Sequence, residues 1–150
     1  MQFNVINTSS QFAEGYCLAK FKGIAEETLN NGNKVYKLHF NLLGNKAGAM
    51  VETQMKTGII ASVKDQPGVL QESVIKDLCG AVGVAYSTVI DIPVVGDPLG
   101  VFDKTVRVWM KKSIFNGGES LNMAWKDSHC IWPADKQTAA LAPKKGDYGI

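Results

Sequence analysis

The sequence is poor in the features that would place it in a specialised protein class. Its 3 cysteines are odd in number and far apart, which argues against a disulfide framework. No apolar run approaches the roughly 20 residues of a membrane helix, and the N-terminus lacks the basic and apolar segments of a signal peptide. We therefore expect a protein of the cytoplasm that contacts no membrane.

An excess of one charge is also missing. The chain has 16 basic and 14 acidic side chains, a net charge of +2, so no global basicity indicates a nucleic-acid partner. The basic residues are nevertheless clustered at three places: Lys20, Lys22, Lys34 and Lys37; Lys104, Arg107, Lys111 and Lys112; Lys144 and Lys145. A nearly neutral chain can hide a basic groove, and the alternative is that these clusters are solvated faces.

Catalytic motifs are lacking as well. There is no G-x-S-x-G, no glycine-rich phosphate loop with a lysine, no metalloprotease His-Glu pairing and no cysteine with an evident base. A metal site of His39, Cys17, His129 and Cys130 is disfavoured, because zinc ligands usually come in close pairs on a turn. We expect neither an enzyme nor a cofactor or metal, and three reduced, mostly buried thiols.

The chain has 150 residues, the size of one domain, and is rich in glycine turns. We expect a single domain over residues 1–132 and a flexible tail over 133–150, which is small, polar and basic. Strands are expected over 15–25, 34–43 and 49–62. The second alternates cleanly, with Tyr36, Leu38, Phe40 and Leu42 on one side and Val35, Lys37, His39 and Asn41 on the other.

A helix is expected next, over 67–83, because apolar residues recur there every three or four positions. Two further strands, 105–114 and 120–127, flank a turn at Asn116-Gly117-Gly118. This order predicts a mainly β fold, an OB-fold-like five-stranded barrel with one helix between strands 3 and 4. Other small β-barrels share this count of elements, so the fold alone assigns no function.

Several stretches also resemble a family of small phage and prophage proteins that bind single-stranded DNA. The likeness is carried by GYCLAKFKGIAEETLNNGNKVYKLHFNLL, IKDLCGAVGV, DPLGVF and TVRVWMKKSIFNGGESLNMAW, in this order, over residues 15–127. It implies an OB-fold, a role in replication or recombination, and the host cell cytoplasm as location. The chain departs from the pattern at its end, because APKKGDYGI replaces the acidic tail that commonly recruits partners in such proteins.

Trp109 is the residue that makes this interpretation concrete. It alternates with Arg107 and Lys111 on one strand, and single strands are held by cations along the phosphates and by aromatic faces that stack on bases. The candidate nucleic-acid-binding residues are Lys20, Lys22, Lys37, His39, Arg107, Trp109, Lys111 and Lys126. The alternative for Trp109 is a place in the core. For Trp125 and Trp132 the core is the favoured interpretation.

The predicted function is therefore sequence-independent binding of single-stranded DNA, which it would protect during replication or recombination. Replication or recombination proteins and a second copy of the chain remain open as partners. The alternative from another class is a non-enzymatic viral structural or protein-interaction β-barrel, and a third is an inhibitor of a host protein. Salt-dependent binding to oligonucleotides separates the first from the others, because phosphate contacts release counterions.

Overall fold

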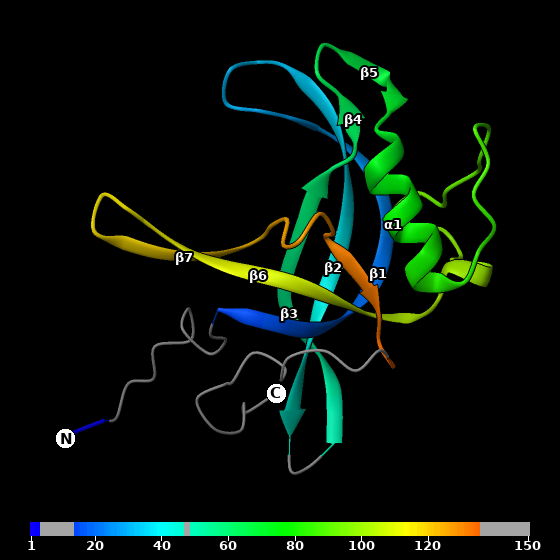
Figure 1. Ribbon diagram of the computed structural model, residues 1–150. Coiled ribbons are helices and arrows are strands. Elements are labelled where there is room, and N and C mark those ends of the chain that lie inside the picture. Colours follow the sequence, from blue (N-terminus) through cyan, green and yellow to red (C-terminus); the bar gives the residue numbers. More distant parts are fainter. Residues whose placement is uncertain (4–13, 47–48, 136–150) are drawn as a thin grey trace.

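The computed structural model describes residues 1–3, 14–46 and 49–135, and this part of the chain is mainly β with one α-helix (Figure 1). Six strands form one antiparallel sheet in the order β3-β2-β1-β6-β7, with β8 paired to β6. The strands are β1 (Gly15–Thr28), β2 (Lys34–Lys46), β3 (Ala49–Ile60), β6 (Thr105–Phe115), β7 (Gly118–Met123) and β8 (Ile131–Pro133).

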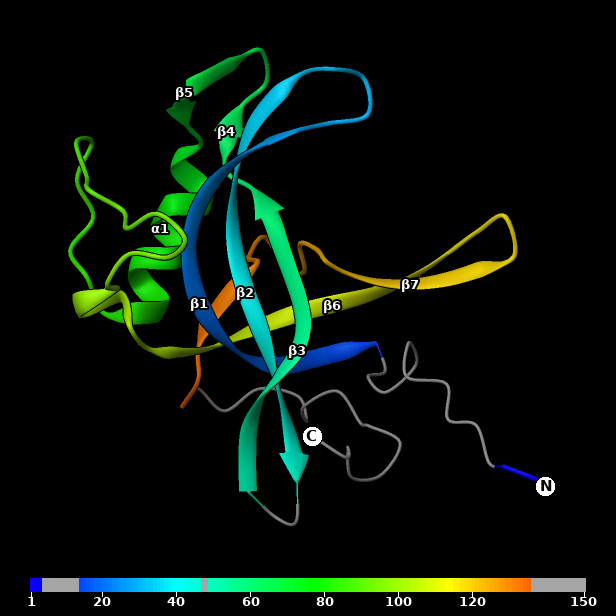
Figure 2. The same ribbon diagram turned by 180° about the vertical axis from the view of Figure 1, so that it is seen from behind.

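Strand β1 is the centre of this sheet and belongs to two ladders. Its first part, from Gly15 to Lys20, pairs with β6, and the part from Ala19 to Thr28 pairs with β2. The register of the second ladder shifts between Phe21 and Gly23, where Gly23 has φ +119°. A bulge bends a strand and increases its twist, and β1 curves around one side of the molecule in Figure 2.

The core lies on one face of the curved sheet, as the alternation of β2 and β6 predicts. Leu38, Phe40 and Leu42 of β2 are completely buried. Val106, Val108 and Met110 of β6 are buried equally well. Antiparallel strands that bury alternate residues leave the other face of the sheet for polar side chains.

Helix α1 (Glu72–Val82) covers this core with its apolar side. It packs against β6 and β8, and its buried residues are Val74, Ile75, Leu78, Cys79 and Val82. It ends at Gly83, whose φ of 76° is the left-handed conformation that glycine adopts at no steric cost. The expected end of the helix is therefore correct, but its expected beginning at Pro67 is wrong.

The segment before the helix forms a second, two-stranded sheet of β4 (Ser62–Val63) and β5 (Gln66–Leu70). The helix thus follows the fifth strand. The sequence-based expectation that it lies between strands 3 and 4 is wrong. Tertiary hydrogen bonds explain the difference: the Gln71 backbone N–H donates to the Ala61 carbonyl, and its side-chain amide donates to the Ser62 carbonyl. These contacts hold the segment extended despite its helical apolar spacing.

The large sheet has six strands and does not close, so the five-stranded barrel expected from the sequence is not confirmed. Its edges, β3 and β7, do not form a ladder among the described residues. They do approach each other, and the Met123 backbone N–H donates to Thr57 Oγ1 at 3.2 Å. The second hairpin closes on a two-residue turn, Asn116 and Gly117, with φ of 51° and 79°, so Gly118 already belongs to β7.

Strand β8 is an element that the sequence did not predict. It pairs with β6 through Val106 and Pro133, one residue beyond the expected domain boundary at 132. The carbonyl of Ala134, the next residue, accepts a hydrogen bond from the Arg107 guanidinium at 2.9 Å. Most of the expected tail, residues 136–150, lies outside the described residues.

The long connection between α1 and β6 is fastened to β1 at the bulge. Ile24 N–H donates to the Pro93 carbonyl at 2.9 Å, and Val95 N–H donates to the Ile24 carbonyl at 3.0 Å. Together they form a short parallel bridge. Further along, the 3₁₀ turn Gly100–Phe102 places Phe102 against Phe21, with ring centroids 6.0 Å apart. The connection therefore closes one side of the core.

Candidate nucleic-acid interface

The candidate binding residues of β1, β2 and β6 lie on the face of the sheet opposite to the core, which we call the outer face. Paired residues of an antiparallel ladder point to the same side. Tyr16 is paired with Trp109, and Lys20 is paired with both Asn41 and Thr105. The same alternation places seven of the expected residues on this face: Lys20, Lys22, Lys37, His39, Arg107, Trp109 and Lys111.

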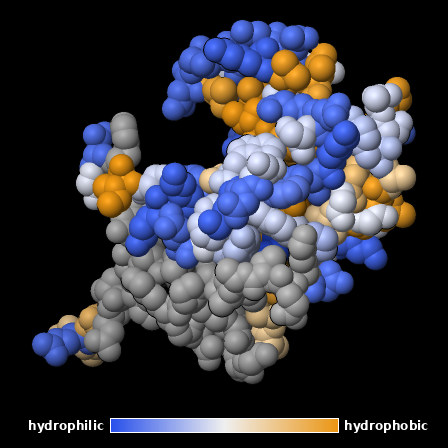
Figure 3. Space-filling view, viewed as in Figure 1, coloured by the Kyte–Doolittle hydropathy of each residue, from blue (hydrophilic) through white to orange (hydrophobic). Residues whose placement is uncertain are grey.

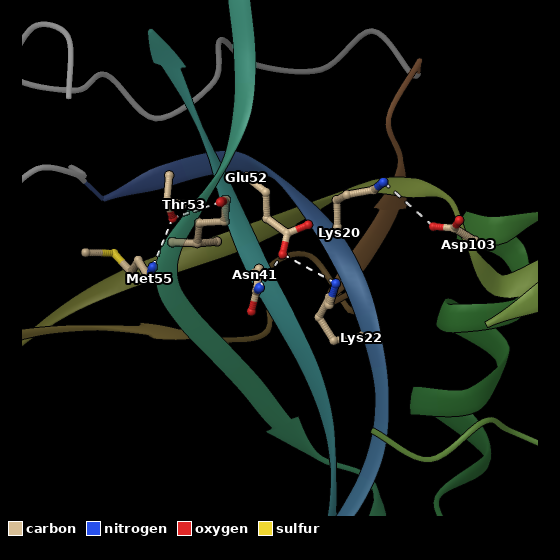
Figure 4. Close-up of polar contacts among 8 residues, drawn as sticks. Lys20, Lys22, Asn41, Glu52, Thr53, Met55 and Asp103 are labelled. Atoms are coloured by element: carbon tan, nitrogen blue, oxygen red, sulfur yellow. Dashed lines mark hydrogen bonds and ion pairs between the residues drawn. The ribbon is translucent and has the colours of Figure 1, made fainter. Parts of the chain in front are cut away.

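Carboxylates are interleaved with these cations, which the sequence did not predict (Figure 4). Lys20 Nζ lies 3.7 Å from Asp103 Oδ1, and Lys22 Nζ lies 3.3 Å from Glu52 Oε2. Both lysine side chains are 37% exposed, so they remain within reach of solvent ions. Exposed ion pairs of this kind contribute only about 0–1 kcal/mol, and a strongly charged ligand can compete with them.

Glu52 is the best held of these carboxylates. Its partial burial alone would raise the pKa, but the hydrogen bond from Asn41, the contact with Lys22 and the nearby charge of Lys20 together lower the pKa below its ordinary value. Glu52 is therefore ionised at neutral pH. It fixes the Lys22 side chain above the outer face.

His39 forms a second cluster with Glu27 and Lys37. Its Nε2 lies 2.9 Å from Glu27 Oε2, at ion-pair distance but without the orientation of a hydrogen bond. Lys37 Nζ lies 3.8 Å from the other oxygen of the same carboxylate. The imidazole is therefore held between acidic and basic side chains of the outer face. This place agrees with the alternation of β2, which puts His39 on the same side as Lys37 and Asn41.

Trp109 is neither fully exposed nor part of the core. It is half-buried, with its ring in an edge-on contact with Tyr16 at a centroid distance of 5.0 Å. Tyr16 contacts Trp132 in the same way at 5.1 Å. Lys126, the eighth expected residue, places its Nζ 4.6 Å from the centre of the Trp109 ring. An aromatic row thus crosses β6, β1 and β8 with one lysine above it.

A cleft of about 740 Å³ lies beside the outer face, where the sheet edges fail to join. Figure 3 shows a hollow between the β1–β2 connection at the top and the β6–β7 hairpin at the left. Its wall includes Trp125, which is 43% exposed, together with Lys34 and Lys64. A smaller cleft of about 280 Å³ adjoins it through Lys37 and Gly58, which line both.

Trp125, Lys34, Lys64 and Lys56 are surface residues that the candidate set did not contain. The expectation that Trp125 is core is wrong. It rested on a continuous strand through residue 127, in which Trp125 would share the buried side of Met123. Strand β7 ends at Met123, so that periodicity no longer applies to Trp125. Trp132, in contrast, is only 7% exposed, so it is buried as expected. Its pairing with Arg107 nevertheless places it on the outer face, and it does not belong to the core cluster that α1 covers.

The cysteines occupy buried positions. Cys17, Cys79 and Cys130 are all buried and reduced. Burial, the charge of Asp77 and a hydrogen bond to Asp77 raise the pKa of the Cys130 thiol well above its usual range. Among the described residues, no group of three or more histidine, cysteine, aspartate or glutamate side chains could hold a metal ion.

Comparisons with known proteins do not assign the chain to a family. No protein-family model matches the chain, and no curated protein matches it significantly. In the part of the chain that the structure describes, no helix is long and apolar enough to cross a membrane. The resemblance to phage single-stranded DNA-binding proteins therefore stays a prediction.

Proposed function

We propose that this chain binds single-stranded DNA with little sequence preference, along the outer face of the sheet and the adjoining cleft. Cations would follow the phosphates, and Trp109 and Trp125 would offer rings on which bases stack. No covalent step is involved. Shielding of single strands during replication or recombination is the role that fits such binding.

The observation that carries the proposal is the shared face. Two neighbouring strands, β1 and β2, and the distant strand β6 bring their lysines, Arg107 and Trp109 to the same side of one curved sheet. Cationic and aromatic side chains on a common surface are what a flexible, charged strand requires. The strand order, with β1 shared between a meander and the last hairpin, also supports an OB-fold arrangement as part of the proposal.

The carboxylates of the outer face must be displaced from their lysines before DNA phosphates can bind there. Glu27, Glu52 and Asp103 neutralise lysines in the free protein, so a phosphate must replace a carboxylate as the partner of each. Such an exchange costs little, because exposed ion pairs are weak. It does make binding depend on salt, since every phosphate contact releases counterions and lowers log K by about 0.7 per tenfold increase in salt.

Titration with fluorescent dT and rU oligonucleotides and with a duplex, each at two salt concentrations, tests the proposal. We expect a steep salt dependence and weaker binding of the duplex. Lys22→Ala should reduce the slope by about 0.7. Lys76→Ala is the matched control, because Lys76 is also ion-paired but lies on α1, away from the outer face. A slope near zero, or equal affinity for duplex and single strand, would refute the proposal.

One feature favours a second candidate function, a protein-interaction module. The connection between α1 and β6 exposes several apolar side chains, with Val89 at 87% and Val101 at 67% exposure. Exposed apolar patches commonly mark protein contacts. The same titration separates the two candidates: a module of this kind shows no salt-dependent affinity for oligonucleotides.

A further inference from the structure

Lys126 covers the ring of Trp109, on which the proposed function expects a base to stack. Its ammonium lies 4.6 Å from the centre of the Trp109 indole, within the range of cation–π attraction. A nucleobase stacked on that side of the ring would need the same space. Tyr16 contacts the ring as well, so the indole cannot turn freely to offer another surface.

The backbone beneath Lys126 is held in an unusual turn. Lys126 and His129 exchange two backbone hydrogen bonds, of 2.7 and 3.1 Å. The two residues between them, Asp127 and Ser128, have φ of 52° and 68°. Aspartate is among the residues that tolerate the left-handed conformation, whereas serine adopts it at some cost. Contacts outside the turn therefore help to hold it.

Asp77 of helix α1 supplies those contacts. One carboxylate oxygen lies 2.9 Å from His129 Nδ1, and the other accepts the Cys130 backbone N–H at 2.8 Å. The Asp77 side chain is only 10% exposed, so it is well shielded from water. The main chain of Lys126 is thus fixed from the helix. Its long side chain, which contacts the indole, has several rotatable bonds and remains able to move.

We propose that Lys126 is an exchangeable cover of a stacking site on Trp109. The inference rests on the proposed function. In the free protein the ammonium occupies the ring, and on binding an unstacked base takes its place while the ammonium moves to a phosphate of the same strand. A duplex keeps its bases stacked on one another and cannot make this exchange. Only an unstacked base can therefore displace the ammonium from the ring.

Two alanine variants test the exchange. Lys126→Ala uncovers the ring and removes one cation. Lys111→Ala removes one cation from the same face without touching the ring, which makes it the matched control. Without DNA, acrylamide should quench tryptophan fluorescence more strongly in the Lys126→Ala protein than in the unaltered protein. In the Lys111→Ala protein the quenching should equal that of the unaltered protein. Acrylamide is neutral, so the lost charge does not bias the comparison.

Binding of a dT oligonucleotide at high salt gives the second measurement. At about 1 M salt the Debye length is roughly 3 Å, and phosphate contacts contribute little. Lys126→Ala should then bind about 2- to 5-fold more tightly than the unaltered protein, the factor that corresponds to an exposed cation–π contact. Lys111→Ala should show no such gain.

The possible failures can be told apart. If the unaltered protein shows no salt-dependent binding of the oligonucleotide, the proposed function falls, and the exchange falls with it. If it does bind, but Lys126→Ala is weaker than or equal to Lys111→Ala at high salt, the exchange alone is refuted and Lys126 is an ordinary phosphate contact. Unchanged acrylamide quenching in the Lys126→Ala protein would likewise refute the proposal that Lys126 covers the Trp109 ring.

Discussion

Gly23 is the residue at which a single methyl group should do the most damage. A Cβ added there would lie 2.7 Å from the Val95 nitrogen and 2.8 Å from the Val94 carbonyl carbon. Both are backbone atoms, which cannot rotate away as the end of a flexible side chain would. The φ of +119° is in addition unfavourable for any residue with a Cβ.

The expected cost of Gly23→Ala follows from these two terms. The backbone conformation costs about 1–3 kcal/mol. If the connection is pushed away from β1, its two hydrogen bonds with Ile24 are lost, at about 0.5–1.5 kcal/mol each. We therefore expect the free energy of unfolding to fall by about 2–6 kcal/mol. For a domain of this size, Tm should fall by roughly 2–4 °C for each kcal/mol.

Alanine substitutions at two other glycines distinguish the cost of the positive φ from the cost of the steric contact. Gly96 lies in the same connection with φ +98°, but an added Cβ meets nothing within 4 Å. Gly68 has neither a positive φ nor a close neighbour, so alanine should be nearly neutral there. Urea denaturation of the three alanine variants provides the comparison. If Gly23→Ala costs no more than Gly96→Ala, the close approach of the connection does not contribute as argued.

Three further predictions concern the site and the thiols. Because the folded-state pKa of Glu52 is lowered from its ordinary value of 4.5, its contribution to stability is present above that value and is lost as the pH falls through the lowered folded-state pKa. Glu52→Gln should flatten this acid limb in urea titrations by less than about 1 kcal/mol, and identical limbs would contradict the reasoning. Cys130, buried and with a raised pKa, should react with a thiol reagent at neutral pH only after unfolding, and rapid labelling of the native protein would show that the region around β8 opens. Trp109→Ala should cost about 1–3 kcal/mol of stability, less than the roughly 3–5 kcal/mol of a fully buried aromatic ring, and should also weaken oligonucleotide binding; a loss beyond about 4 kcal/mol in chemical denaturation would assign the ring to the core.

The parts of the fold that the sequence predicted are those with local signals. Alternation in β2 and β6 identified which side chains are buried, and Asn116-Gly117 located a hairpin turn, because these signals lie within a few residues. Strand β8 has three residues, too few for any periodicity to show. The segment 66–70 carries Pro67 and a helical apolar spacing, yet tertiary contacts made through Gln71 hold it as a strand.

The candidate site shows the same division between local and distant information. Alternation correctly placed Arg107, Trp109 and Lys111 on one face of β6. It could not show that Asp103 approaches Lys20, or that Lys126 covers the Trp109 ring, because those contacts join residues from separate elements. Exposure of an aromatic side chain in a small β protein depends on such distant contacts. For this reason the sequence left Trp109 undecided between surface and core.

The double pairing of β1 has a consequence for the order of folding. Its ladder with β2 joins neighbouring segments, whereas its ladder with β6 joins Lys20 to Thr105 across most of the described chain. Closing a long loop costs more entropy than closing a short one, and distant pairings slow the formation of β-structure. The β1–β2–β3 meander should therefore gain amide protection before β6 docks, which pulse-labelling hydrogen exchange during refolding can detect. Until β6 docks, the outer face consists of the β1, β2 and β3 side chains alone, and the contribution of Arg107, Trp109 and Lys111 is missing.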